Sequence, residues 1–347
     1  MKSVLLEMEK LRKPNSGLGQ FCLHLGKEFA SANPQDLELN FYVPASQGGI
    51  FGDRFTYMSH SPLHKIVPAS ARMDVWHCMH QGSKYLPASR ATRLILTIHD
   101  LNFLQKYSGL KRKLHLHALQ QKVKRAAAIT FISKYTEQVA KETLVLPAVP
   151  SRVIHNGNSL AFFPNPQRPP FAPAGKFIFA IGIISEKKNF HTLVGFLSAL
   201  KNVSLVITGE NTGAYARQIV ERGRSLRVSD RLVLPGMVSD EEKYWLYAHC
   251  EAFVFPALAE GFGLPVVEAM SCGKPVFLAS SSSLPEIGGE AAYYWDDFDP
   301  AAMKAVFEKG MAAFSADPSC ARKCIARAEQ FSWEKAAEEY LGLYRSV

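Results

Sequence analysis

The chain has 347 residues, 47% of them hydrophobic and 20% charged, which is enough for two domains of about 150–175 residues each. No apolar run approaches the roughly 20 residues that a membrane-spanning helix needs, and the apolar part of the first expected strand is too short for a signal peptide. The six cysteines are scattered without the spacing of a disulfide framework, as expected for reduced thiols. These features favour a cytoplasmic protein.

The net charge of +9 is unevenly distributed along the chain. Residues 1–165 carry a net charge of +11 and nine of the eleven histidines, whereas residues 166–347 carry −2. Such asymmetry favours an anionic partner for the first half, either a membrane surface, a phosphorylated molecule or a nucleic acid. A solvated basic surface without a partner explains the same charges equally well.

Short apolar runs alternate with helical segments along both halves of the chain. In the first half, strands are expected at 3–6, 39–43, 75–77, 94–98 and 129–132, and helices near 18–32, 111–126 and 135–143. In the second half, strands are expected at 177–180, 204–208, 232–234, 252–255 and 275–278. Strands that alternate with helices predict parallel sheets with helices on both faces, so the expected fold class is α/β with doubly wound sheets.

Five prolines between residues 162 and 173 separate the two series of strands. Such a segment cannot be helical and makes a poor strand, so we expect an interdomain linker there. It divides the chain into a domain at 1–163 and a domain at 174–330. The chain ends in an amphipathic helix, for which Ser332 is the expected cap.

The most informative segment leads from the strand at 252–255 through a glycine-rich turn into a helix near Pro265. Proline suits the first turn of a helix, and the backbone N–H groups of Gly263 and Leu264 would then point out of the helix N-terminus, where they can bind a phosphate. The segment therefore predicts an anion site.

Glu260 and Glu268 place a carboxylate on each side of this anion site. Carboxylates accept hydrogen bonds and sugar hydroxyls donate them, so the segment predicts a pocket for a nucleotide sugar. An ordinary strand–turn–helix unit, with Glu268 favouring the helix dipole, is the simpler alternative.

The spacing of these two glutamates resembles the Glu-x7-Glu signature of retaining glycosyltransferases with the GT-B fold, family four in particular. The resemblance implies two Rossmann-like domains that face each other across a cleft, with binding at the carboxyl ends of both sheets. It also implies that the C-terminal helix, 332–347, packs back on the N-terminal domain.

The same resemblance assigns roles to the Glu-x7-Glu segment. It implies that Glu260 contacts the transferred sugar and that Glu268 holds the ribose hydroxyls. The turn residues Gly261, Phe262, Gly263 and Leu264 would contact the sugar and the diphosphate.

A second phosphate-binding segment runs from Gly182 to Asn189 and resembles the Gly-x-x-x-Pro-Arg-Lys-Asn form of the family, with Lys188 as the phosphate lysine. It departs from that form at Glu186, at Lys187 and in lacking an arginine directly after Gly182. Either one diphosphate cation is missing here, or Lys187 compensates as a point charge without the bidentate fork of arginine.

The segment from 234 to 243 resembles the stretch that lies beside the nucleobase. The backbone of Met237 and Val238 would bind the base. Lys243 would either reach the phosphates or be an exposed helix lysine.

In the first half, Gly17 and Gly19 lie in a loop that follows the first strand. The loop is not a G-x-G-x-x-G dinucleotide pattern, because position 22 is cysteine. It resembles the family loop whose amides approach the donor diphosphate, although a tight strand–helix turn would have the same composition.

Polar residues also end two strands of the first half. The resemblance implies that His99 lies beside the transferred sugar, whereas a lone histidine is more often packed. Asp100 would meet the acceptor hydroxyl or fix local structure. His77 and His80 would line the acceptor pocket or pack in the core.

Two other patterns suggest metal sites without the partners that such sites need. Asp296 to Asp299 contains a D-x-D in a polar connection, which we interpret as a solvated loop. Cys320 and Cys324 could share a helix face, but no second Cys/His pair at ligand spacing lies nearby. We expect no cofactor and no obligate metal.

The resemblance implies an enzyme that moves a hexose from a nucleoside diphosphate sugar to a hydroxyl acceptor in the synthesis of a surface polysaccharide or glycolipid. The Glu-Lys-Lys-Asn form looks most like mannosyltransferases, so the first expected donor is GDP-mannose and the second is a UDP-hexose. The alternatives are a synthase that acts on a small soluble sugar, and a non-catalytic protein that binds nucleotides or glycans.

No nucleic acid partner is expected. The acceptor is expected to be anionic, such as a lipid-linked oligosaccharide, or to lie at an anionic membrane on which the protein is peripheral. Basic residues around one helix would make this contact: Lys106, Lys111, Arg112, Lys113, Lys122, Lys124 and Arg125.

Overall fold

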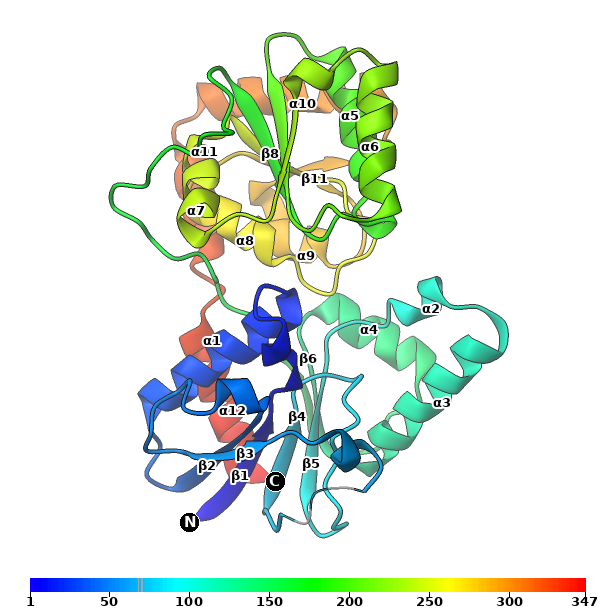
Figure 1. Cartoon of the computed structure of the whole chain (residues 1–347), viewed down its shortest axis with the longest axis vertical. Helices are drawn as coiled ribbons and strands as arrows, with labels where there is room; N and C mark the ends of the chain where they lie inside the picture. Colours follow the sequence, from blue (N-terminus) through cyan, green and yellow to red (C-terminus); the bar gives the residue numbers. More distant parts are fainter. Residues whose placement is uncertain (68, 70) are drawn as a thin grey trace. The chain divides into compact units, whose positions relative to one another are not determined.

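The computed structural model describes every residue except 68 and 70, and the chain divides into two compact units (Figure 1). The first unit comprises Met1–Gly157 and Ser332–Val347, and the second comprises Asn158–Phe331. Each unit is a parallel sheet with helices on both faces, which confirms the expected fold class.

The first unit contains a seven-stranded sheet in the order β3-β2-β1-β4-β5-β6-β7. Its strands are β1 Lys2–Glu7, β2 Leu37–Val43, β3 Thr56–Ser59, β4 Val75–Cys78, β5 Arg93–Ile98, β6 Ala126–Phe131 and β7 Ser151–Val153. Its helices are α1 Gly17–Ala32, α2 Phe103–Lys106, α3 Gly109–Arg125, α4 Lys134–Thr143 and α12 Trp333–Ser346, with short 3-10 turns η1 Glu9–Arg12, η2 Ala45–Gln47 and η3 Pro62–Lys65. The five strands expected from the sequence are all present, whereas the edge strands β3 and β7 were not expected.

The second unit contains a six-stranded sheet in the order β10-β9-β8-β11-β12-β13. Its strands are β8 Phe177–Ile181, β9 Ser204–Thr208, β10 Leu232–Gly236, β11 Ala252–Phe255, β12 Val276–Ala279 and β13 Tyr293–Trp295. Its helices are α5 Phe190–Ala199, α6 Ala214–Ser225, α7 Asp240–His249, α8 Leu264–Ser271, α9 Leu284–Gly288, α10 Pro300–Ala316 and α11 Ser319–Ala328, with 3-10 turns η4 Glu186–Lys188, η5 Ser229–Arg231 and η6 Gly289–Ala291.

The direction of winding reverses once in each sheet. In the first unit the reversal lies between β1 and β4, and in the second it lies between β8 and β11. Ligands of open parallel sheets bind outside the carboxyl ends of the strands at such a reversal. Functional side chains are therefore expected at these two points.

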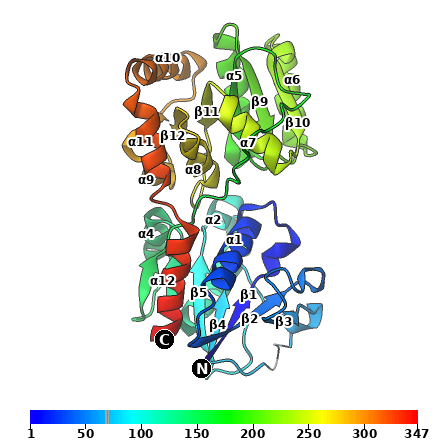
Figure 2. The ribbon, with the colours of Figure 1, turned by 90° about the vertical axis from the view of Figure 1, so that its left-hand side faces the viewer.

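The C-terminal helix α12 belongs to the first unit and runs beside α1 (Figure 2). Its inner face is aromatic: the ring centroids of Tyr344 and Phe29 are 5.7 Å apart, and those of Trp333 and Phe21 are 5.9 Å apart. The Tyr340 hydroxyl lies 3.2 Å from the hydroxyls of Thr97 and Thr130 on the sheet. The helix thus completes the cover of this face of the sheet.

The boundary between the units differs from the expected linker. The chain passes from the first unit to the second after Gly157, and the proline-rich segment at 162–173 is part of the second unit. Within it, the backbone N–H of Gln167 donates to the Glu241 carboxylate on α7 (2.9 Å). The prolines exclude regular structure, as expected, but the segment lies against its own unit.

Where the loop after β1 enters α1, the backbone of Gly19 lies very close to the backbone of Lys13 and Pro14. Ser16 caps α1 by accepting a hydrogen bond from the Gly19 N–H (3.1 Å). A Cβ on Gly19 would lie 2.1 Å from the carbonyl oxygen of Lys13 and 2.7 Å from the Cα of Pro14, whereas a Cβ on Gly17 would meet nothing within 4 Å. Glycine is required at position 19 by the packing of the loop.

We predict that Gly19→Ala lowers the unfolding free energy of the first unit by about 2 kcal/mol or more, because backbone atoms must shift to admit the methyl group. Gly17→Ala is the matched control and is expected to change it by less than about 1 kcal/mol. Denaturant unfolding of the full chain, followed by the tryptophan signal, measures both. Equal stability of the two variants would contradict the assigned geometry.

Candidate functional site

The reversal in the second unit brings a lysine and a glutamate together. Lys188 ends η4, which follows β8, and Glu260 lies in the turn after β11. The Lys188 Nζ and the Glu260 carboxylate form an ion pair, with side chains only 10% and 13% exposed. The same Nζ lies 4.6 Å from the centroid of the Phe255 ring. Two residues 72 positions apart in the chain are thus held in one place.

Backbone and hydroxyl contacts fix the turn that carries Glu260. Its N–H donates to the Ser282 hydroxyl (3.1 Å), and the Ser283 hydroxyl lies 3.0 Å from the Glu260 carbonyl and 2.7 Å from the Phe262 carbonyl, which both accept from it. Ser283 is completely buried. The carboxylate is therefore presented by a turn that is tied to the start of α9.

A glycine opposite Lys188 leaves room for its side chain. Gly182 has a φ of +149°, and a Cβ there would lie 3.1 Å from the Lys188 Cε. Lys187, by contrast, is exposed, and its carbonyl accepts a hydrogen bond from the Leu258 N–H (2.8 Å). The buried lysine of the predicted pair is the one that meets the glutamate.

The turn then enters α8 with the predicted geometry. Gly263 is the N-cap, with a φ of +115°, and Pro265 lies in the first turn. The first N–H groups of an α-helix have no partner inside the helix. A helix N-terminus therefore lies in the segment that follows Glu260 and could receive an anion.

Glu268, one turn into α8, is buried and belongs to a second polar cluster. The Tyr247 hydroxyl donates to its Oε2 (2.8 Å), and the Lys243 Nζ lies 3.5 Å from its Oε1. Burial raises the pKa of Glu268, against the opposing effect of the Lys243 charge. Burial lowers the pKa of Lys243, but the charges of Glu268 and Asp240 outweigh this effect and raise it.

Lys243 is therefore not an exposed helix lysine, since its side chain is 12% exposed and it also pairs with Asp240 at 3.2 Å. Met237 is 60% exposed and Val238 is partly buried. That their backbone binds a base, and that Lys243 reaches phosphates, stay predictions.

In the first unit, His99 follows β5 and is almost completely buried. Its Nε2 donates to the Met79 carbonyl (2.7 Å), its backbone N–H donates to the Gln81 side chain (3.0 Å), and the Phe21 ring packs edge-on against it at 4.5 Å. Burial lowers the pKa of His99 to about 3, so the imidazole is neutral at physiological pH.

His77 packs in the core, which is the second of the two roles expected for it, and does not line a pocket. It is completely buried, and its ring nitrogens lie 2.7 Å from the Tyr344 hydroxyl and 2.7 Å from the Thr97 hydroxyl. Side chains alternate along a strand, so His77 on β4 points into the layer beneath α12, whereas His80 lies beyond the end of the strand. Burial lowers the pKa of His77 to about 3 as well.

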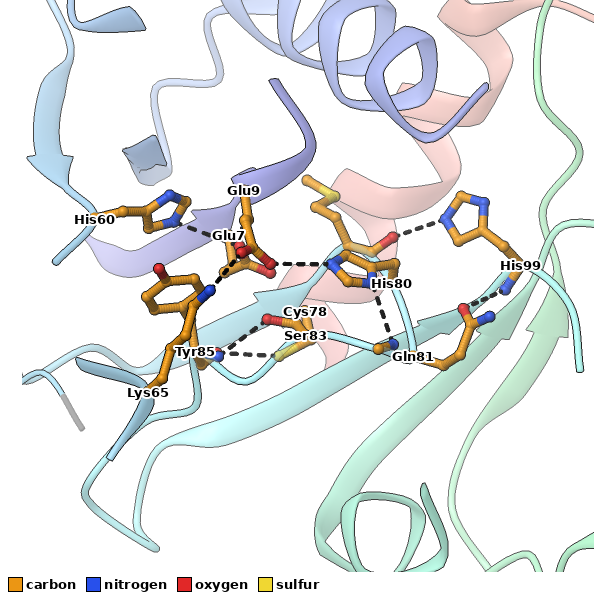
Figure 3. Close-up of polar contacts among 12 residues, drawn as sticks. Glu7, Glu9, His60, Lys65, Cys78, His80, Gln81, Ser83, Tyr85 and His99 are labelled. Carbon is orange, nitrogen blue, oxygen red and sulfur yellow. Dashed lines mark hydrogen bonds and ion pairs between the residues drawn. The ribbon is translucent and has the colours of Figure 1, made fainter. Parts of the chain in front are cut away.

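The other two candidates, His80 and Asp100, follow β4 and β5 at the carboxyl edge of the first sheet, and Figure 3 shows His80 there. His80 accepts a hydrogen bond from the Gly82 N–H at its Nδ1 (3.1 Å), and its Nε2 lies 3.8 Å from Glu9 Oε2. The Asp100 carboxylate accepts from the Asn102 N–H (3.0 Å), which supports its alternative role in local structure.

Sequence reasoning missed Tyr247, Glu7 and Glu9. Tyr247 meets Glu268 only through the packing of α7 on α8, for which the sequence holds no signal. Glu7 and Glu9 follow the strand expected at 3–6, and two carboxylates at the carboxyl end of a buried strand are a signal that could have been used.

The basic helix α3 is only partly available to a partner. The Lys122 ammonium donates to the carbonyls of Gln81 (2.7 Å) and Ser83 (2.6 Å), and Arg125 donates to those of Pro87 (2.6 Å) and Ser89 (2.8 Å). These two residues stabilise the loop after β4, which corrects their assignment to the free basic surface. The residues of that surface that stay exposed are Lys106, Lys111, Arg112, Lys113 and Lys124.

The predicted D-x-D segment has a structural role at its end. Asp299 caps α10, since its Oδ1 accepts from the N–H groups of Ala301 (2.9 Å) and Ala302 (3.2 Å). Asp296 and Asp297 are exposed in the turn before it.

Two family models match the chain in succession. Residues 21–162 match the model "Glycosyltransferase Family 4", and residues 163–331 match the model "Glycosyl transferases group 1". The two matches together span most of both units.

Curated relatives include O-antigen chain mannosyltransferase B of Escherichia coli, which is 25% identical over 99% of both chains. The serotype-specific mannosyltransferase WbdA of Escherichia coli is 30% identical over 47% of this chain and 21% of its own length. Among solved structures, Anabaena Alr3699/HepE in complex with UDP and glucose superposes over 100% of both chains with a TM-score of 0.76 and 17% identity. Sucrose-phosphate synthase from Thermosynechococcus elongatus superposes with a TM-score of 0.74 and 18% identity over 99% of this chain and 98% of that one.

Proposed function

The chain belongs to the family-four glycosyltransferases with the GT-B fold, and we propose that it transfers a hexose with retention of configuration from a nucleoside diphosphate sugar to a hydroxyl acceptor. The first candidate donor is GDP-mannose, ahead of a UDP-hexose, because relatives that match 99% and 47% of this chain are named mannosyltransferases. The name of the full-length relative supports an acceptor in surface polysaccharide or glycolipid synthesis.

The observation that carries this proposal is the Lys188–Glu260 pair at the reversal of the second sheet. An ammonium group has three donors, so Lys188 can bind a phosphate oxygen in addition to Glu260. Together with the N-terminus of α8 it would stabilise the charge that develops on the departing diphosphate, from positions fixed before reaction.

Glu260 and Glu268 each bind the hydroxyls of one end of the donor. Glu260, presented by its fixed turn, accepts hydrogen bonds from the hydroxyls of the transferred sugar. Glu268, buried between Tyr247 and Lys243, accepts those of the ribose. His99 is neutral, and its proposed role is to hold the sugar or the acceptor by hydrogen bonding.

We predict that Lys188→Gln and Glu260→Gln each reduce turnover by about 100-fold or more, since each removes a charge that acts on the leaving group or the sugar. Glu268→Gln should chiefly raise the dissociation constant of the donor, because the ribose changes little during reaction. The measurements are steady-state transfer from GDP-mannose and UDP-glucose, and thermal shift with GDP and UDP.

The matched control is the exposed pair of Lys176 and Glu251, which lie 3.1 Å apart in the same unit. Lys176→Gln and Glu251→Gln should leave turnover and donor binding as in the wild type. Near-normal turnover of folded Lys188→Gln or Glu260→Gln would show that the site is assigned wrongly. A folded wild type that neither transfers nor hydrolyses any donor would favour a binding protein.

We also propose that the transfer needs no divalent metal, because Lys188 and the α8 N-terminus supply positive charge for the diphosphate. The expected result is unchanged transfer in excess chelator after dialysis. Loss of transfer that manganese or magnesium restores would contradict the proposal and direct attention to Asp296 and Asp297.

The proposed acceptor is anionic or lies at an anionic membrane, and α3 is the proposed contact. Among the described residues, no helix is long and apolar enough to cross a bilayer. On α3, Leu110 is 72% exposed and Leu114 is 59% exposed beside the free basic residues. Each basic residue near an anionic surface contributes about 1 kcal/mol, within a Debye length of about 8 Å.

We predict that the protein co-sediments with vesicles that contain anionic lipid and that raising the salt concentration several-fold releases it. Neutralising Lys111, Arg112 and Lys113 with glutamine should abolish this binding. Neutralising Arg217, Arg222 and Arg224, which are exposed on α6, removes the same charge and should leave binding unchanged. Absence of binding at low salt, with efficient transfer to a neutral soluble sugar, would favour a synthase of small saccharides.

A further inference from the structure

The first unit holds an ionic cluster that the mechanism above does not use. It consists of Glu7, Glu9, His60, Lys65 and His80, and we call it the β1 cluster (Figure 3). Glu7 ends β1 opposite Cys78 at the end of β4, so Glu9 and His80 each follow two residues later. The cluster therefore lies at the reversal of the first sheet, where ligands of such sheets bind.

Glu7 is a fully buried member of this cluster, and its position is fixed. It is completely buried, with His60 Nε2 at 3.4 Å from its Oε1. Burial by itself raises the pKa of Glu7, but His60 and His80 outweigh it, so the pKa is lowered and the carboxyl group is ionised. The same Oε1 accepts the backbone N–H of Glu9 at 2.8 Å. A buried carboxylate is costly and adds little stability, yet here it fixes the backbone of the next glutamate.

Glu9 and Lys65 are the members of the cluster that a ligand can reach, since their side chains are 15% and 33% exposed. The Lys65 ammonium donates to Glu9 Oε1 at 3.0 Å, and His80 Nε2 lies 3.8 Å from Glu9 Oε2. His80 and Lys65 lower the pKa of Glu9 to about 2. The group is thus a permanent carboxylate whose two oxygens still have lone pairs to offer.

His80 lacks one of its hydrogen-bond partners. Its Nδ1 accepts a hydrogen bond from the Gly82 N–H, which leaves Nε2 as the ring nitrogen that can donate. That atom points toward Glu9 at 3.8 Å, which is too long for a hydrogen bond, and it has no other partner among the described residues. The side chain is only 4% exposed. Buried polar atoms are rarely left unpaired, so the Glu9–His80 pair is arranged for a group that supplies further hydrogen bonds.

Hydroxyl groups fit this arrangement best. A hydroxyl donates to the carboxylate and accepts from an N–H, whereas a phosphate would be repelled by the Glu9 charge. Among the described residues, no group of three His, Cys, Asp or Glu side chains could hold a metal ion.

We propose that Glu9 binds hydroxyls of the acceptor glycan and selects a neutral sugar end over a phosphorylated one, with His80 and Lys65 as the residues that position it. This proposal rests on the transferase function proposed above. It assigns the negative charge of the acceptor, where there is one, to a part of the molecule away from the sugar that receives the hexose.

The experiment compares neutral methyl hexosides, methyl α-mannoside among them, with the same hexosides as 6-phosphates. Saturation-transfer NMR measures their binding to the full chain, and transfer from the active donor measures acceptor KM. Glu9→Gln, which keeps the shape and removes the charge, should weaken binding of the neutral hexosides and raise their KM about 10- to 100-fold. Because repulsion is lost as well, the ratio of phosphorylated to neutral hexoside binding should rise.

Two readouts separate this role from a structural one. Thermal shift with GDP and UDP and the rate of donor hydrolysis should be those of the wild type, since the nucleotide binds to the second unit. Asp36→Asn is the matched control, because Asp36 is ion-paired with Arg345 (2.6 Å) at the amino edge of the same sheet; it should change neither readout nor the acceptor preference.

The proposal is overturned if neutral hexosides bind equally to the wild type and to Glu9→Gln, or bind to neither. It is also overturned if Glu9→Gln weakens both classes of hexoside equally and lowers the melting temperature, which would indicate a structural carboxylate. Failure of the transferase function itself would appear differently, as a wild type without donor hydrolysis or transfer.

Discussion

The strand order of each sheet reverses once, and this constraint determines where the chemistry of the protein can lie. At a reversal the connections on either side of two neighbouring strands run in opposite directions, which opens a crevice at the carboxyl edge. Lys188 and Glu260 occupy that position in the second unit, and Glu9 and His80 occupy it in the first. The two residues of each pair are far apart in sequence, and they meet only because adjacent parallel strands end at the same edge of the sheet.

Both positions hold ionised groups that are largely buried, and such groups are a poor source of stability. Removing a carboxylate from water costs several kcal/mol, which an ion pair barely repays. The contacts around them have another effect, which is precise placement: Ser282 and Ser283 fix the turn of Glu260, and Glu7 fixes the backbone of Glu9. Groups held in this way need no rearrangement when charge develops or a hydroxyl arrives.

The sequence predicted most strands of the fold and the helix start after Glu260 well, because both depend on local patterns. The apolar runs give the strands, and the turn before Pro265 gives the helix start that the structure contains. The sequence could not show that His77 and His99 have different surroundings in the fold. Both histidines are buried, His77 on β4 and His99 directly after β5, and only the phase of the pleat places His77 beneath α12.

The sequence also could not predict which basic side chains of α3 are free, as Lys122 and Arg125 show. Counted along the chain they add to a basic surface, yet their side chains turn toward carbonyl groups of the loop after β4. Which face of α3 is free depends on how the helix packs, and the packing is set by Leu119 and Val123 on its buried side. Edge strands such as β3 were missed because their alternation is short and half-exposed.

The loop from Met79 to Tyr85 joins the two features of the first unit that concern the acceptor. His80 reaches Glu9 from this loop, while the carbonyls of Gln81 and Ser83 bind Lys122 of α3. A carboxylate for sugar hydroxyls and a basic helix for an anionic surface would conflict if one chemical group had to satisfy both. They agree for an acceptor whose neutral sugar end and anionic carrier are different parts of one molecule. The loop would then hold the two binding surfaces at a fixed separation, so that the position of the carrier on α3 limits which sugar of the acceptor can reach Glu9.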